Sequence, residues 1–120
     1  MNLFDWQRLK NSFQHAWKGL WEVWRKEQNF WIMIVMAMLV IFLMIVLEIS
    51  PVEKTILVVT VAGVLSAEIL NTVVEIIADK LDFEKQINIK LVKDMMAGYV
   101  LIWSVTAVIA GLIIFWPYIF

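Results

Sequence analysis

The 120-residue sequence contains no cysteine, one histidine, two prolines and four glycines. The missing thiols exclude disulfides and thiolate metal centres, and a single histidine, His15, excludes a histidine-rich metal site. Any bound metal must therefore take oxygen ligands, which favours Mg²⁺. The glycines lie too far apart to form a phosphate-binding loop. No dense run of Lys and Arg indicates nucleic-acid binding, and the formal net charge is -1.

Hydrophobic residues make up 62% of the chain, far more than a soluble domain carries, and they gather in three long runs. The predicted membrane spans are residues 30–47, 55–78 and 95–116, each long enough to cross a bilayer as a helix. Pro51 separates the first two spans, and Pro117 is predicted to close the third. We therefore expect residues 1–120 to form a single all-α integral-membrane domain with three transmembrane helices.

The first 28 residues follow a different pattern, because apolar side chains recur every three or four positions. One helical stripe contains Trp6, Leu9, Phe13, Trp17, Leu20 and Trp24. The opposite face is polar, so residues 1–28 are predicted to form an amphipathic helix that lies among the lipid headgroups. The alternative is a soluble helix packed on a partner. Tryptophan favours the membrane interface, which supports the first interpretation.

The basic residues predict the orientation in the membrane. Five precede the first span, one lies in the first loop, and four lie between the second and third spans. By the positive-inside rule, the N-terminus and the second loop face the cytoplasm. The second span then places Glu75 and Asp79 near the cytoplasmic surface, with Glu68 about two turns deeper.

The second span has a polar stripe at helical spacing, formed by Glu68, Asn71, Thr72, Glu75 and Asp79. A carboxylate inside a bilayer costs about 2.5 to 3.5 kcal/mol on insertion scales, so function is the preferred interpretation. Such groups suit a hard cation and a proton acceptor. In the alternative, Glu68 and Glu75 are neutral packing residues and Thr72 bonds to its own helix.

Lys93 and Asp94 are predicted to begin the third span. Helix N-terminal amides attract anions there, and the lysine adds a positive charge suited to phosphate. The alternatives are a lysine that extends to the membrane interface and an acid that only stabilises a helix start.

These residues resemble the prokaryotic integral-membrane diacylglycerol kinases and the related undecaprenol kinases. The family pattern E-x-x-N-[ST]-x-x-E-x-x-x-D runs here from Glu68 to Asp79, and the later Lys-Asp pair is Lys93-Asp94. The blocks at 8–20 and 27–30 are also similar, so the resemblance covers essentially the whole chain. The chain departs from the family at residues 84–86, where Glu-Lys-Gln replaces the frequent Glu-Tyr-His, and at Met33, which replaces an acid found in some members.

The resemblance implies a bacterial inner-membrane enzyme, multi-pass, with a cytoplasmic active site and a homotrimeric bundle whose neighbouring subunits share composite sites. By motif position Glu68 would be the general base, assisted by Asn71, and Glu27 and Glu75 would bind Mg²⁺. The residues implied in nucleotide binding are Arg8, Glu27, Glu75, Asp79, Lys93 and Asp94. Without the motif, Glu27 could equally be a solvated interfacial acid and Arg8 a lipid-headgroup contact.

The predicted function is ATP- and Mg²⁺-dependent phosphorylation of a membrane lipid alcohol, with diacylglycerol converted to phosphatidic acid and undecaprenol as the alternative substrate. A small proton-coupled multidrug exporter also uses a membrane glutamate, but such proteins have four spans. A non-catalytic membrane anchor would leave the buried acids unexplained.

Overall fold

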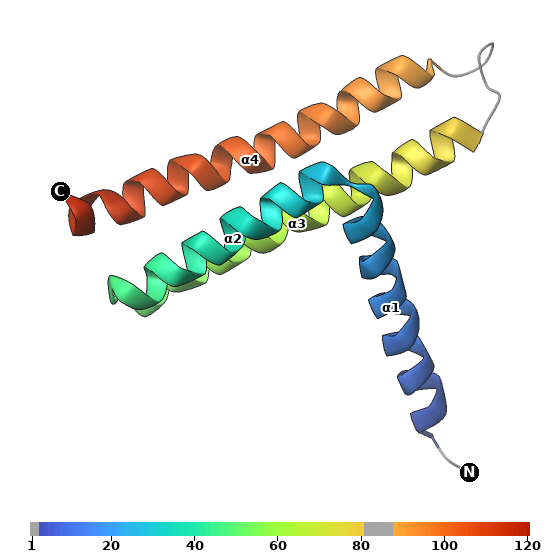
Figure 1. Cartoon of the computed structure of the whole chain (residues 1–120), viewed down its shortest axis with the longest axis horizontal. Coiled ribbons are helices and arrows are strands. Elements are labelled where there is room, and N and C mark those ends of the chain that lie inside the picture. The colour runs from blue at the N-terminus through green and yellow to red at the C-terminus, as the bar shows by residue number, and fades with distance from the viewer. Residues whose placement is uncertain (1–2, 81–87) are drawn as a thin grey trace.

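The computed structural model describes residues 3–80 and 88–120, and over these ranges the chain forms four helices and no strand (Figure 1). The helices are α1 (Trp6–Lys26), α2 (Gln28–Val46), α3 (Pro51–Lys80) and α4 (Ile89–Ile119). α2, α3 and α4 lie lengthwise, and α3 contacts both of the others. Each of the three is long and apolar enough to cross a membrane. The all-α membrane fold with three spans and a further helix at the N-terminus is therefore confirmed.

The outward surfaces of the spans are apolar. Met38 and Phe42 on α2, and Ile102 and Ile113 on α4, each expose 60% or more of their surface. Soluble proteins rarely expose continuous apolar surface of this extent. Lipid hydrocarbon is the solvent that suits these faces.

α1 leaves the three spans at a steep angle (Figure 1). The change of direction occurs at Glu27, whose extended backbone (φ -113°, ψ 110°) ends α1 and precedes α2. Val23 and Phe30 are buried on the two sides of this junction. Trp24 and Trp31 also face each other across it, with ring centroids 5.9 Å apart. Packing around the junction therefore sets the direction of α1.

Most of the apolar stripe of α1 is left exposed by the other described residues. Phe13 and Trp17 are 70% and 72% exposed, and Trp6 is 74% exposed. An amphipathic helix that crosses a membrane bundle at a steep angle lies close to the bilayer plane, where its apolar face enters the lipid. The geometry fits the predicted surface helix, and its position on a membrane stays a prediction.

Two ends of the bundle differ in what they bury. At one end of the bundle α1 joins α2, α3 ends and α4 begins; we call this region "the α1 end". The opposite end contains the apolar cluster of Met44, Ile49, Leu57, Ile114 and Phe115. There the Tyr118 hydroxyl also donates a hydrogen bond of 2.7 Å to Glu53, which ties the end of α4 to the start of α3. The buried acid Glu68 lies outside this cluster, on the part of α3 that leads to the α1 end.

The ends of the helices differ from the predicted spans. α3 begins at Pro51 instead of residue 55, because the first helical position needs no backbone N–H. Ser50 and Glu53 cap this start reciprocally, at 3.2 Å in each direction. The prediction that Pro117 closes the third span is wrong, since α4 continues to Ile119. A proline in the last turn removes one donor, and the Phe120 N–H still reaches the Trp116 carbonyl at 3.0 Å.

α3 and α4 approach closely at Gly63. A β-carbon added there would overlap the indole ring of Trp103 on α4, whereas one added at Gly98 or Gly111 would meet nothing within 4 Å. Ala67, one turn further along α3, is 1% exposed. Small residues on this face therefore let α4 pack directly against α3.

Candidate active site

The polar stripe of α3 runs from the interior of the bundle to its surface. Glu68 is only 4% exposed and Thr72 is 3% exposed, Asn71 is half-buried, and Glu75 and Asp79 are exposed. Spacings of three and four residues keep these side chains on one helical face. The predicted stripe therefore forms a line of acids that extends from a buried position to the aqueous end of the helix.

Glu68 is the buried acid of this line. Glu27, at the α1–α2 junction, lies near enough for its charge to influence Glu68. The structure shows no hydrogen bond to the Glu68 carboxylate among the described residues. The Thr72 hydroxyl instead donates to the Glu68 backbone carbonyl at 3.0 Å, as the structural alternative for Thr72 predicts. Glu68 is thus available to an external partner.

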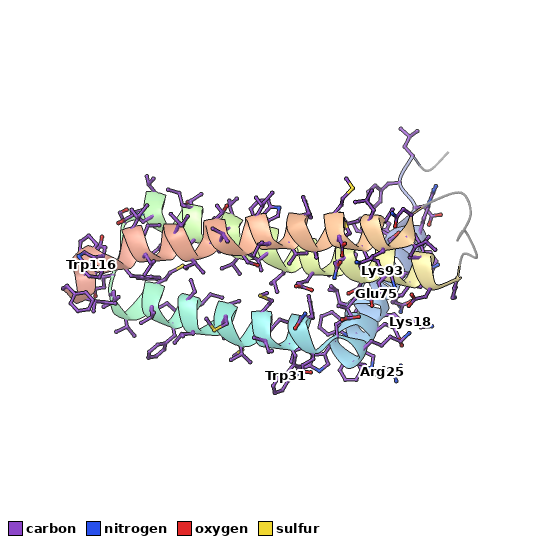
Figure 2. The ribbon with its side chains drawn as sticks, turned by 90° about the horizontal axis from the view of Figure 1, so that it is seen from above. Lys18, Arg25, Trp31, Glu75, Lys93 and Trp116 are labelled. Atoms are coloured by element: carbon purple, nitrogen blue, oxygen red, sulfur yellow. The ribbon has the colours of Figure 1, made fainter. Side chains whose placement is uncertain are left out.

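Lys93 lies beside the outer part of the stripe, although it comes from α4. Its ammonium donates a 2.9 Å hydrogen bond to Asp79 and is also close enough to interact with the charge of Glu75. Figure 2 shows Lys93 and Glu75 at the α1 end, with Trp116 at the opposite end. The side chains of Lys93 and Asp79 are 40% and 62% exposed, so solvent screens this pair. The pair places the positive charge of Lys93 at the exposed end of the polar stripe of α3. The sequence pattern did not indicate that these two residues pair.

The prediction that Lys93 and Asp94 begin a helix is wrong. α4 begins four residues earlier, at Ile89, because the Asn88 side chain caps it by accepting from the Leu91 N–H at 3.0 Å. The free N-terminal amides therefore lie ahead of Lys93, whose own side chain can still bind phosphate. The neighbouring Asp94 is exposed on the helix surface.

Arg8 is not brought to this group of residues within one chain. It lies near the start of α1, nineteen residues before Glu27, which is about 28 Å along a helix. Its backbone contacts are local, to Asp5 and Ser12. Residues 84–86, where the chain departs from the family pattern, lie outside the described residues.

Glu22 on α1 is engaged elsewhere. Arg25 donates to it at 3.2 Å, and Lys26 lies 3.6 Å away. The hydrogen bonds and charge of Arg25 lower the pKa of Glu22 below its ordinary value, with a smaller contribution from Lys26. Glu22 is therefore an ionised surface residue whose partners are on its own helix.

No group of three or more Asp, Glu, His or Cys side chains within the described ranges could hold a metal ion alone. The candidate ligands at the α1 end include the carboxylates of Glu27, Glu68, Glu75 and Asp79. Their oxygen atoms are the donors that hard divalent cations prefer. One or two protein carboxylates together with phosphate oxygens is a common way to bind Mg²⁺, so the donor set fits an ion that arrives with a nucleotide.

Comparisons with known proteins show what the chain is similar to. The family model described as prokaryotic diacylglycerol kinase matches residues 14–115. Undecaprenol kinase of Bacillus subtilis is 36% identical over 110 residues, covering 92% of this chain and 89% of that protein. Diacylglycerol kinase of Escherichia coli is 28% identical over 117 residues, covering 98% and 96%. All of the candidate site residues except Arg8 lie within the matched region.

Proposed function

The chain belongs to the prokaryotic diacylglycerol kinase family and is a lipid kinase, and from this we propose that it transfers the γ-phosphoryl group of ATP to the primary hydroxyl of a membrane lipid alcohol. The observation that carries this proposal is the change in burial along α3. Glu68 is buried where a lipid can approach, whereas Glu75 and Asp79 are exposed where a nucleotide can approach. One helical face thus connects the two substrates.

In the proposed reaction the lipid oxygen bonds to the γ-phosphorus, and the bond from that phosphorus to the bridging oxygen of ADP breaks. Glu68 accepts the proton of the lipid hydroxyl. Asn71, on the same face, would position the hydroxyl through its amide. Lys93, held by Asp79, would place positive charge against the nucleotide phosphates, and Asp94 would contribute to nucleotide binding.

A kinase of this family uses ATP and typically a divalent metal. Mg²⁺ is the ion we propose, with Glu27 and Glu75 as its protein ligands. When bound, such an ion neutralises charge on the phosphate oxygens. The position of Glu27 at the junction of α1 and α2, near enough to Glu68 on α3 for its charge to act there, supports this role.

A homotrimer with shared active sites also belongs to this proposal. Arg8 is too far from Glu68 in one chain to serve the same site, so a neighbouring subunit would have to supply it. The apolar outer faces of the three spans offer surface for such neighbours. Sedimentation equilibrium in density-matched detergent would test the trimer, and a monomeric mass in active preparations would contradict it.

We place the α1 end at the cytoplasmic face of the bacterial inner membrane. The basic residues before α2 and those from the end of α3 to the first turns of α4 support this orientation. Reporter fusions after residue 51 should then show activity outside the cytoplasm, and fusions after residue 88 should show activity inside it. The reverse pattern would place the proposed nucleotide site on the wrong side of the membrane for ATP.

Diacylglycerol is the substrate we propose, with phosphatidic acid as the product. Undecaprenol is the second candidate, because the undecaprenol kinase of Bacillus subtilis shares more identical residues with this chain than the Escherichia coli diacylglycerol kinase does. The experiment is an assay of the purified protein in mixed micelles with radiolabelled ATP and each lipid in turn. Phosphorylation of neither lipid, in a preparation that retains its helical content, would contradict the proposed function.

A further inference from the structure

An apolar groove of about 670 Å³ runs between α2 and α4, with α3 as its floor. Representative lining residues are Met33 and Ala37 from α2, Val64 and Leu65 from α3, and Ser104 and Gly111 from α4. The volume lies in the range of known ligand pockets. None of the described residues that line it is charged, so the groove suits hydrocarbon and does not suit a nucleotide.

Among the described residues that line the groove, Ser104 is the one that carries a hydroxyl, and this hydroxyl differs from the others on these helices. Its Oγ atom is shielded from solvent and has no hydrogen-bond partner among the described residues. The threonines of the same helices behave differently. Thr60, Thr72 and Thr106 each donate to a carbonyl of their own helix, at 2.7 to 3.0 Å. An unpaired buried hydroxyl is unfavourable, so a partner that supplies an acceptor oxygen would be favoured here.

Glu68 lies one helical turn beyond the α3 residues that line the groove. Val64 and Leu65 precede Glu68 by four and three residues, so all three lie on the same face of α3. On α4, Ser104 follows Trp103, the residue that packs against Gly63 of α3. Glu68 lies five residues beyond Gly63, about 7.5 Å nearer the α1 end. Side chains tilt toward the N-terminus of their own helix, so those of Glu68 and Ser104 tilt toward each other along the bundle.

We infer that Ser104 determines lipid specificity by donating a hydrogen bond to an ester carbonyl of a glycerolipid whose free hydroxyl lies at Glu68 and whose acyl chain lies in the groove. This inference rests on the proposed lipid-kinase function. A diacylglycerol has carbonyl oxygens within a few bonds of its hydroxyl, and rotation of the serine about χ1 turns its Oγ toward them. A polyprenol has no oxygen besides the reacting hydroxyl. Ser104 therefore favours a diacylglycerol over a polyprenol.

The test compares three lipid alcohols with the full-length protein in mixed micelles. They are a diacylglycerol, the matching dialkylglycerol, whose ether linkages lack carbonyl oxygens, and undecaprenol. Ser104→Ala should lower kcat/KM for the diacylglycerol about 2- to 10-fold, the range for loss of one hydrogen bond, and leave the other two lipids unchanged. Thr106→Ala is the matched control, because the Thr106 hydroxyl already donates to the Ile102 carbonyl.

Each other outcome overturns the inference. An equal loss with all three lipids would give Ser104 only a structural role, and no loss with any lipid would mean that its hydroxyl does not contact the substrate. Wild-type activity with undecaprenol but with neither glycerolipid would overturn the assignment of Ser104 while leaving the lipid kinase intact. An unaltered protein that phosphorylates none of the three lipids would contradict the proposed function itself.

Discussion

Replacing Glu75 by glutamine is expected to reduce lipid phosphorylation by on the order of 10²- to 10³-fold, the range seen when one group that stabilises transition-state charge is removed. The amide keeps the size of the side chain but removes a negative charge from the proposed Mg²⁺ site. Glu75 is exposed at the α1 end, close enough to Lys93 for their charges to interact. The substitution therefore should not disturb a buried packing contact.

The informative measurement is turnover as a function of Mg²⁺ concentration at saturating lipid. Glu75→Gln should shift the half-maximal Mg²⁺ concentration upward, because a ligand has been weakened. Glu48→Gln is the matched control, since Glu48 is an exposed glutamate in the turn between α2 and α3, at the opposite end of the bundle. Near-normal turnover with an unaltered Mg²⁺ dependence would mean that Glu75 is a surface residue with no part in metal binding.

The parts of the fold that follow from hydrophobicity could be predicted from the sequence. Apolar runs of bilayer length define the three spans, because a helix satisfies its backbone hydrogen bonds internally wherever the chain enters lipid. The ends of the helices could not be located in this way. Pro51 begins α3 and Pro117 lies inside α4, since the effect of a proline depends on which backbone donors are already free at its position.

The candidate site likewise has a part that the sequence could predict and a part that it could not. Helical spacing alone places Glu68, Asn71 and Glu75 on one face of α3, because three and four residues correspond to one turn. Contacts between helices have no such local rule. The proximity of Glu27 to Glu68 depends on the direction in which α1 leaves α2, and the Asp79–Lys93 pair depends on the register of α3 against α4. Neither the direction of α1 nor the register of α3 against α4 can be deduced from the spacing of residues in the sequence.

Ser104 illustrates the same limit for a single side chain. A serine in an apolar helix normally bonds to a carbonyl of its own helix, and nothing in the sequence distinguishes Ser104 from such residues. Its interest arises only from the missing partner and from the groove that it lines. Both are properties of packing among three helices.

Replacing Glu68, the proposed general base, is expected to have the second large effect on activity. Glu68 is 4% exposed, has no hydrogen bond to its carboxylate within the described part of the chain, and lies one helical turn beyond the α3 residues that line a groove suited to lipid. Glutamine has nearly the same shape and can still form hydrogen bonds, but it cannot accept the hydroxyl proton. Glu68→Gln should therefore lower kcat by roughly 10²- to 10⁴-fold, the usual contribution of a general base.

Two further measurements separate this role from a structural one and from metal binding. Stability in detergent should be unchanged or higher, because glutamine removes the cost of a carboxyl group buried in a membrane span and away from partners. Binding of a non-hydrolysable ATP analogue and its Mg²⁺ dependence should match the wild type, whereas Glu75→Gln should alter both.

If Glu68→Gln kept most of its turnover, or lost nucleotide binding in proportion to turnover, the proton acceptor would have to be sought elsewhere. Glu27 would then be the next residue to replace, since it lies at the α1–α2 junction, near enough to Glu68 on α3 for its charge to act there.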